Sequence, residues 1–221
     1  MVARADLSFD EFVEFQFDRA ARADGDAWYF DVDSDWWAPE PRTGIAYLSR
    51  LFAKGPEVLQ GFSDTQIAQG LSGLVNTTVD VPPWMSDPVT PAAERAGVWH
   101  AITRFFADTL GPRCTPTLGH LSEEGAPLNM RTYMWWDGFP PLTTPDDPER
   151  SIVDNAELAC LQAVLALDSA ACQEAALHGL GHWVWREPRS AAIIDAYLEA
   201  GSAARPELAD YARAARGGCI L

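Results

Sequence analysis

The chain has 221 residues, of which 48% are hydrophobic and 22% charged, a globular composition that excludes a disordered polypeptide. Its formal net charge of −16 at pH 7 argues against binding to nucleic acid or to an anionic membrane surface, because both are negatively charged. The same charge favours a basic protein partner, and the alternative is that the acidity only keeps the chain soluble.

The amino-terminal segment and the cysteines predict a cytoplasmic protein. The segment MVARADLSFDEF lacks the apolar region of a signal peptide, and no stretch reaches the roughly 18 apolar residues of a membrane span. Cys114, Cys160, Cys172 and Cys219 form no CxxC pair, so we expect reduced thiols and not a disulfide framework. We expect no cofactor.

Helix signals follow one another along the first half of the chain. Residues 8–11 (SFDE) form a capping box ahead of an apolar helical face. Residues 63–66 (SDTQ) form a second capping box, which predicts a helix from about residue 64 to 75. Thr90-Pro91 opens a third helix with a continuous apolar face, and Gly111-Pro112 is expected to end it.

The second half of the chain also has a helical pattern, with no sustained period-2 alternation that would predict a strand. Four segments are expected to be helices, at about 152–167, 170–185, 190–200 and 206–216. We expect one all-α domain, 1–221. A break at 143–150 (TTPDDPER) would separate an N-terminal half, 1–145, from a C-terminal half, 150–221.

Two irregular stretches, 24–44 and 111–150, are rich in proline, glycine and tryptophan. Tryptophans in such stretches usually fill the side or end of a helical stack. The alternative is an exposed aromatic patch that contacts a partner, and on this alternative Trp135, Trp136 and Asp137 are partner-binding candidates.

The C-terminal segments resemble a known repeat family. SAACQEAALHGLGHW (169–183) is similar to the second helix of a HEAT-like repeat of the phycobilisome-lyase type. SAAIIDAYLEAG (190–201) looks like the first helix of the next unit, and RPELADYARAARGG (205–218) like its partner. The resemblance is best over residues 157–216. It implies an all-α, irregular HEAT-like stack of about eight to ten helices in antiparallel pairs, and says little about activity.

Glu174, His178 and His182 are spaced four residues apart, so on a helix they project from one broad face. Such a face can present three ligands to zinc or a similar ion. The zinc-protease motif is excluded, because Gly179 occupies the place of its glutamate. The repeat comparison places all three residues outward, and an unligated polar face is the preferred interpretation.

Glycines 179 and 181 disfavour a helix interior by about 1 kcal/mol each, which suggests close packing against neighbouring helices. His120 or His100 could supply a fourth metal ligand, but the sequence does not place either of them nearby.

No serine-nucleophile elbow, glycine-rich phosphate loop or cysteine–histidine signature occurs. The sequence therefore predicts a non-catalytic protein-binding module of a bacterial-type cytoplasm that uses an acidic helical-repeat surface. One version is an immunity-type protein that neutralises a basic toxin. The partner-binding candidates are Glu174, His178, His182, Trp135, Trp136 and Asp137. Two alternatives remain, a metal-dependent hydrolase centred on the Glu/His/His face and a structural protein that forms homo-oligomers.

Overall fold

The computed structural model describes residues 3–4, 6–20, 28–30, 35–75, 81–139 and 147–220. These ranges are mainly helical, as the sequence predicts, and their strands β1 (Ala3–Arg4) and β2 (Trp36–Trp37) form a two-residue parallel pair. None of the helices in these ranges has the length and apolarity needed to cross a membrane. The four cysteines are free thiols.

The helices are short and frequently interrupted. In the first half they are α1 (Phe9–Phe17), η1 (Trp28–Phe30), α2 (Pro41–Ala53), α3 (Gly55–Val58), α4 (Asp64–Gly73), α5 (Val81–Ser86), α6 (Ala92–Phe105), η2 (Phe106–Leu110) and α7 (Gly111–Arg113). In the second half they are η3 (Gly119–Leu121), α8 (Pro127–Tyr133), α9 (Trp135–Gly138), α10 (Arg150–Leu165), α11 (Ala170–Trp183), α12 (Pro188–Ala200) and α13 (Glu207–Arg216). Among the described residues, eight of these helices have nine residues or more.

Local sequence signals account for most of the helix ends. Both predicted capping boxes are confirmed: the Ser8 hydroxyl accepts the Glu11 N–H while the Glu11 carboxylate accepts the Ser8 N–H, and the second box at 63–66 is built in the same way. The ends of α10 to α13 fall within two residues of those expected.

The expected end of α6 at Gly111-Pro112 is wrong. The chain passes from α6 through the π-helix η2 into α7 and leaves the helical path at Cys114. Pro112 is tolerated because it stands in the first turn of α7, where its missing N–H is not required. A single π turn shifts the helix register without ending the helix.

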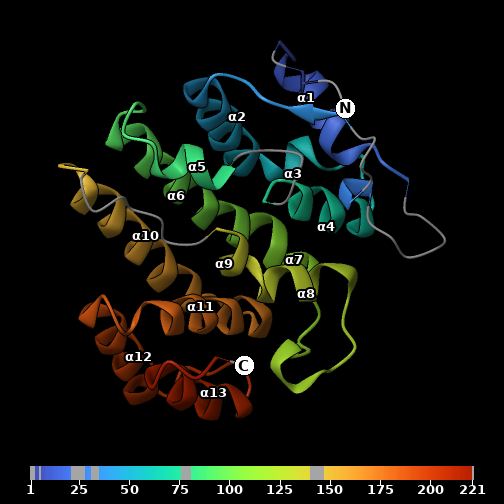
Figure 1. Cartoon of the computed structure of the whole chain (residues 1–221). Helices are drawn as coiled ribbons and strands as arrows, with labels where there is room; N and C mark the ends of the chain where they lie inside the picture. Colours follow the sequence, from blue (N-terminus) through green and yellow to red (C-terminus); the bar gives the residue numbers. More distant parts are fainter. Residues whose placement is uncertain are drawn as a thin grey trace.

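The helices pack in successive layers along the chain (Figure 1). Helix α2 packs on α6, α6 on α10, α10 on α11, and α11 on α13. The first half of the expected break at 143–150, residues 143–146, lies outside the described residues, so the division into two halves stays a prediction.

Helix α11 is the most enclosed part of this arrangement. It contacts α8, α9, α10, α12 and α13. Of its 14 residues, 13 are buried, and His182 is the exception. Any polar side chain on α11 other than His182 therefore needs a partner inside the protein.

The idea of an exposed aromatic patch at Trp135 and Trp136 is wrong, because their exposed fractions are 0% and 1%. Trp135 lies against Phe52, Phe105 and Phe106, at ring-centroid distances of 5.6, 5.9 and 5.3 Å. The tryptophans thus fill the helical stack. Only Asp137, the next residue, reaches the surface.

Candidate metal centre

Three donor atoms converge where α9 meets α11. Asp137 Oδ1 lies 2.9 Å from His182 Nε2 and 3.3 Å from His178 Nε2, and the two Nε2 atoms are 3.2 Å apart. Neighbouring donors around an ion with bonds of about 2.0–2.1 Å are separated by about 2.9 Å at right angles and about 3.4 Å in a tetrahedron. The triangle therefore has the size that one transition-metal ion requires.

The two histidines share a face of α11 because they are one helical turn apart. The His178 side chain is 5% exposed, whereas those of His182 and Asp137 are 36% and 37% exposed. The cluster is thus anchored in the interior on one side and open to solvent on the other.

Gly179 brings the carboxylate to the histidines. A Cβ at this position would lie 2.7 Å from Leu161 Cδ2 and 2.7 Å from Trp136 Cγ. Without that Cβ, the Trp136 ring lies against the α11 backbone, stacked on Trp99 and Phe106 at centroid distances of 5.9 and 6.0 Å. The predicted close packing at Gly179 is thus confirmed. Because Asp137 follows Trp136 in the chain, this packing places the Asp137 carboxylate next to the two histidines.

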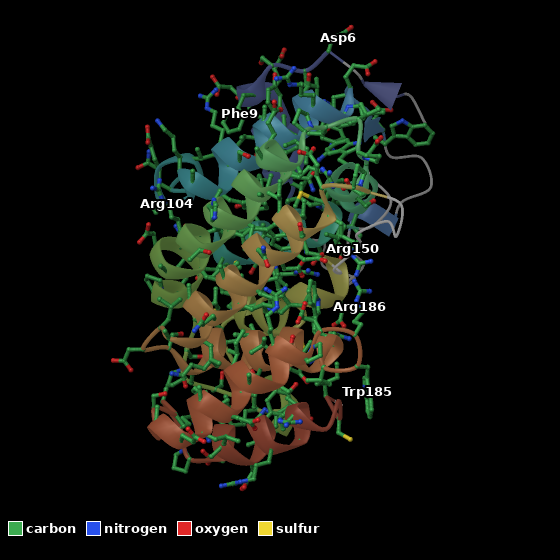
Figure 2. The ribbon with its side chains drawn as sticks, turned by 90° about the vertical axis from the view of Figure 1, so that its left-hand side faces the viewer. Asp6, Phe9, Arg104, Arg150, Trp185 and Arg186 are labelled. Carbon is green, nitrogen blue, oxygen red and sulfur yellow. The ribbon has the colours of Figure 1, made fainter. Side chains whose placement is uncertain are left out.

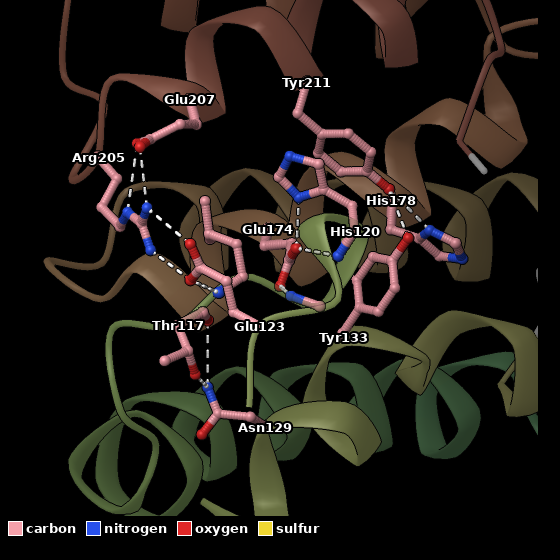
Figure 3. Close-up of polar contacts among 12 residues, drawn as sticks. Thr117, His120, Glu123, Asn129, Tyr133, Glu174, His178, Arg205, Glu207 and Tyr211 are labelled. Atoms are coloured by element: carbon pink, nitrogen blue, oxygen red, sulfur yellow. Dashed lines mark hydrogen bonds and ion pairs between the residues drawn. The ribbon is translucent and has the colours of Figure 1, made fainter. Parts of the chain in front are cut away.

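Glu174 is not one of the three donors. Its carboxylate accepts the N–H groups of Gly119 and His120 at 3.0 and 2.9 Å and contacts His120 Nδ1 at 2.5 Å (Figure 3). With exposed fractions of 1% and 4%, Glu174 and His178 do not face outward, and that expectation is wrong. Gly119 and His120, in the segment 115–126, lie against this side of α11.

Several hydrogen bonds hold that segment in place (Figure 3). Arg205 binds the Glu123 carboxylate with both terminal nitrogens, at 2.6 and 3.0 Å. The Asn129 side chain donates to Thr115 O and Thr117 Oγ1 at 2.8 and 3.0 Å. These hydrogen bonds hold the segment 115–126 in one position beside α11.

His120 lies close to the centre without being a ligand. Its ring stacks on Tyr211 with centroids 4.2 Å apart and an interplanar angle of 16°. The Tyr211 hydroxyl is 2.9 Å from His178 Nδ1. The other proposed fourth ligand, His100, is on α6 and lines a separate groove between α2 and α6.

The electrostatic surroundings favour a neutral imidazole at His178. Burial lowers the pKa of His178, and the neighbouring Asp137 carboxylate offsets part of this effect. The neutral form is the one that binds a metal ion. Burial also raises the pKa values of Tyr133 and Tyr211, so both phenols keep their protons.

Sequence reasoning named six site residues, and the structure brings three of them together. His178 and His182 meet Asp137, Glu174 pairs with His120, and the two tryptophans are in the core. Tyr133 and Tyr211 were missed because no spacing relates them to the histidines. Their one indirect signal is the HGLGH pattern, since two glycines imply a helix enclosed by close neighbours.

The fold and the cluster define an all-α protein with two histidines and one carboxylate at the meeting point of two helices. No protein-family model, no curated protein and no solved structure matches this chain. The geometry of the cluster therefore carries the functional inference.

Proposed function

We propose that the protein binds one divalent transition-metal ion at Asp137, His178 and His182, and that the centre is hydrolytic. The observation that carries the proposal is the triangle of donor atoms with edges of 2.9, 3.2 and 3.3 Å. Catalytic zinc sites use three protein ligands and leave a further position for water or substrate. The partial exposure of His182 and Asp137 provides such an open side.

The residues divide the work of such a centre. His178 and His182 provide lone pairs from neutral rings, and Asp137 provides an anionic oxygen that balances part of the positive charge. The buried His178 fixes the position of the ligand set, while the open side admits a substrate. When bound, the ion supplies Lewis acidity and lowers the pKa of its bound water to about 7.

Metal titration of the untagged, metal-depleted protein tests the proposal. With Zn²⁺ or Co²⁺ as the probe, we expect about one equivalent to bind. Asp137→Asn should abolish stoichiometric binding, whereas Glu174→Gln, checked for an intact fold by circular dichroism, should keep it. Absence of binding, or equal loss in both variants, would overturn the proposal.

Hydrolysis is tested separately, with the metal-loaded protein and a panel of ester, amide and phosphoester substrates. Turnover that disappears in Asp137→Asn supports a hydrolase. Stoichiometric metal without turnover of any of these bonds would reduce the proposed function to metal binding.

A second candidate function is the binding of a basic protein, with an immunity-type role as its most specific version. The observation that favours it is the charge: the chain has 32 acidic and 16 basic residues. Ten of the basic residues already form ion pairs within the described part of the chain. The excess carboxylates thus leave a negative field that a basic surface would complement.

This second candidate predicts salt-sensitive binding to a basic toxin encoded beside it. A mixing experiment that shows neither binding nor inhibition of that toxin would contradict it. Removal of metal ions with a chelator should leave such binding unchanged, which separates this function from the metal centre.

We also propose that the C-terminal helices form a HEAT-like stack. Helix α10 pairs with α11 and α12 with α13, while α10 contacts α12 and α11 packs on α13. Stacked repeats of helix pairs make these contacts. Superposition of the two pairs in an experimental structure tests the proposal, and pairs that cross at unrelated angles would contradict it.

A further inference from the structure

We infer that Tyr211 is a positioning residue of the centre and that, with Tyr133 and the Ile220 carbonyl, it holds His178 in the tautomer that offers Nε2 to the ion. The inference rests on the proposed metal centre. It concerns how residues that do not touch the ion fix the tautomer and position of His178.

The contacts form a chain that leads away from the cluster. His178 Nδ1 lies 2.9 Å from the Tyr211 hydroxyl, which lies 3.3 Å from the Tyr133 hydroxyl (Figure 3). Both hydroxyls lie 3.4 Å from the carbonyl oxygen of Ile220. A continuous series of polar contacts thus connects the His178 imidazole, through the two phenols, to the backbone carbonyl of Ile220.

The direction of the protons along this chain follows from its last member. A carbonyl can only accept, and each phenol donates one proton. If His178 Nδ1–H donates to Tyr211, Tyr211 to Tyr133, and Tyr133 to Ile220 O, three of the four contacts have a proton, and the contact of Tyr211 with Ile220 O does not. In the opposite direction Tyr211 donates to Nδ1 and Tyr133 donates once, so only two of the four contacts have a proton.

The tautomer decides what the cluster can do. With the proton on Nδ1, the His178 Nε2 lone pair points at Asp137 Oδ1 and His182 Nε2, 3.3 and 3.2 Å away. With the proton on Nε2, the same ring would be an ordinary donor to the carboxylate. Metal-binding histidines usually donate their second N–H to a neighbouring acceptor, which fixes the ring and the tautomer.

The surrounding packing holds the two ends of the chain. His120, itself held by Glu174, stacks on the Tyr211 ring. At the other end, a Cβ at Gly181 would lie 2.1 Å from Ile220 Cγ2, so the absence of a side chain lets Ile220 lie against α11. Gly181 thereby allows the C-terminal segment 217–220 to pack on α11, and the carbonyl of Ile220 in that segment is the last acceptor of the hydrogen-bond chain.

Metal affinity of matched hydroxyl deletions tests the inference. With Zn²⁺ as the probe, Tyr211→Phe should weaken binding by about 10–100-fold, the range for loss of an outer partner of a metal-binding histidine. Tyr133→Phe should have a smaller effect. Tyr197→Phe is the control, because it removes another buried hydroxyl, bonded to Gln173 at 2.9 Å, that is not part of the chain. Equal effects of Tyr211→Phe and Tyr197→Phe would overturn the inference.

A measurement on the metal-free protein separates this inference from the proposed function. Long-range ¹H–¹⁵N spectra assign the tautomer of His178, and we expect Nδ1–H in the wild type and a mixture in Tyr211→Phe. The Nε2–H tautomer in the wild type would overturn the inference even if the protein binds metal. Wild-type protein that has the Nδ1–H tautomer but binds no Zn²⁺ would refute the metal centre and leave the positioning by Tyr211 intact.

Discussion

The cluster between α9 and α11 and the groove between α2 and α6 both contain histidine, yet they differ in how their polar groups are arranged. The groove is a cavity of about 480 Å³ lined by Ile45, Ala46, Ser49, Ala53, Glu94, Gly97, His100, Ala101 and Arg104. Its Glu94 carboxylate is already bound by Arg42, at 2.6 and 2.9 Å. Arg104 is exposed, and Figure 2 shows it on the side opposite Trp185 and Arg186.

In the α9–α11 cluster, by contrast, the donor atoms converge on one point while their outer partners are fixed by packing. The volume of a cavity therefore does not by itself identify a chemical site. What marks the site is the number of polar groups directed at the same small space and the rigidity of the residues behind them.

The largest effect is expected from removing a ligand. His178→Ala should weaken Zn²⁺ binding by on the order of 100-fold or more, because a three-ligand site retains only two donors. His100→Ala should leave the affinity unchanged, since His100 lies in the groove. Competition with a chromophoric chelator measures both variants, and a loss of affinity in His100→Ala would break the distinction between the two regions.

The next largest effect is on the free energy of unfolding, and it is expected at Gly179 on α11, in contrast to Gly97 on α6. Gly179→Ala should destabilise the protein by about 1–3 kcal/mol, because a methyl group must fit against Trp136 and Leu161. Gly97→Ala meets no atom within 4 Å in the described structure and should be stabilising by up to about 1 kcal/mol. Urea unfolding of both variants checks this prediction, which a neutral Gly179→Ala would contradict.

The pH dependence of stability should report the buried histidine. Burial lowers the pKa of His178 in the folded state, so the unfolded chain takes up a proton first as the pH falls below about 6.5. The folded state therefore loses stability in acid through this group, and the stabilities above that pH are unaffected by it. Unfolding of the metal-free protein between pH 5 and 8 should show a shallower acid slope in His178→Asn than in wild type or His100→Asn.

The smallest effect is expected at the tail. Gly181→Ala places a methyl group against the Ile220 Cγ2 methyl, which must move aside. Because the Ile220 carbonyl then shifts from Tyr133 and Tyr211, we expect Zn²⁺ affinity to fall only a few-fold, by about 1 kcal/mol or less. A loss as large as that of His178→Ala would show that the tail does more than end the hydrogen-bond chain.

The fold class was accessible from the sequence because its signals are local. The capping boxes at 8–11 and 63–66 and the C-terminal helix ends depend on residues within a few positions of each other. The helix was expected to run as far as Gly111-Pro112, which includes η2, but the further turn α7 was not predicted, because Gly-Pro occurs in two contexts. It ends a helix in most contexts but is compatible with the first turn of a new one.

The candidate site was only half predictable. The pairing of His178 and His182 follows from helical spacing alone, and the structure retains it. Asp137 lies 41 and 45 residues before them in the sequence, and the packing of Trp136 against Gly179 brings it close. Glu174 was assigned to the wrong side because no local pattern shows that Gly119 and His120, about 55 residues earlier, bind its carboxylate.

The adjacency of Trp136 and Asp137 gives the molecule an internal optical reporter. Trp136 is stacked in the core on Trp99, and the next residue along the chain is a proposed ligand. A paramagnetic ion such as Co²⁺ at the centre would lie close enough to these indoles to quench their emission. Occupancy, and its loss on chelation, could then be followed by intrinsic fluorescence without any added label.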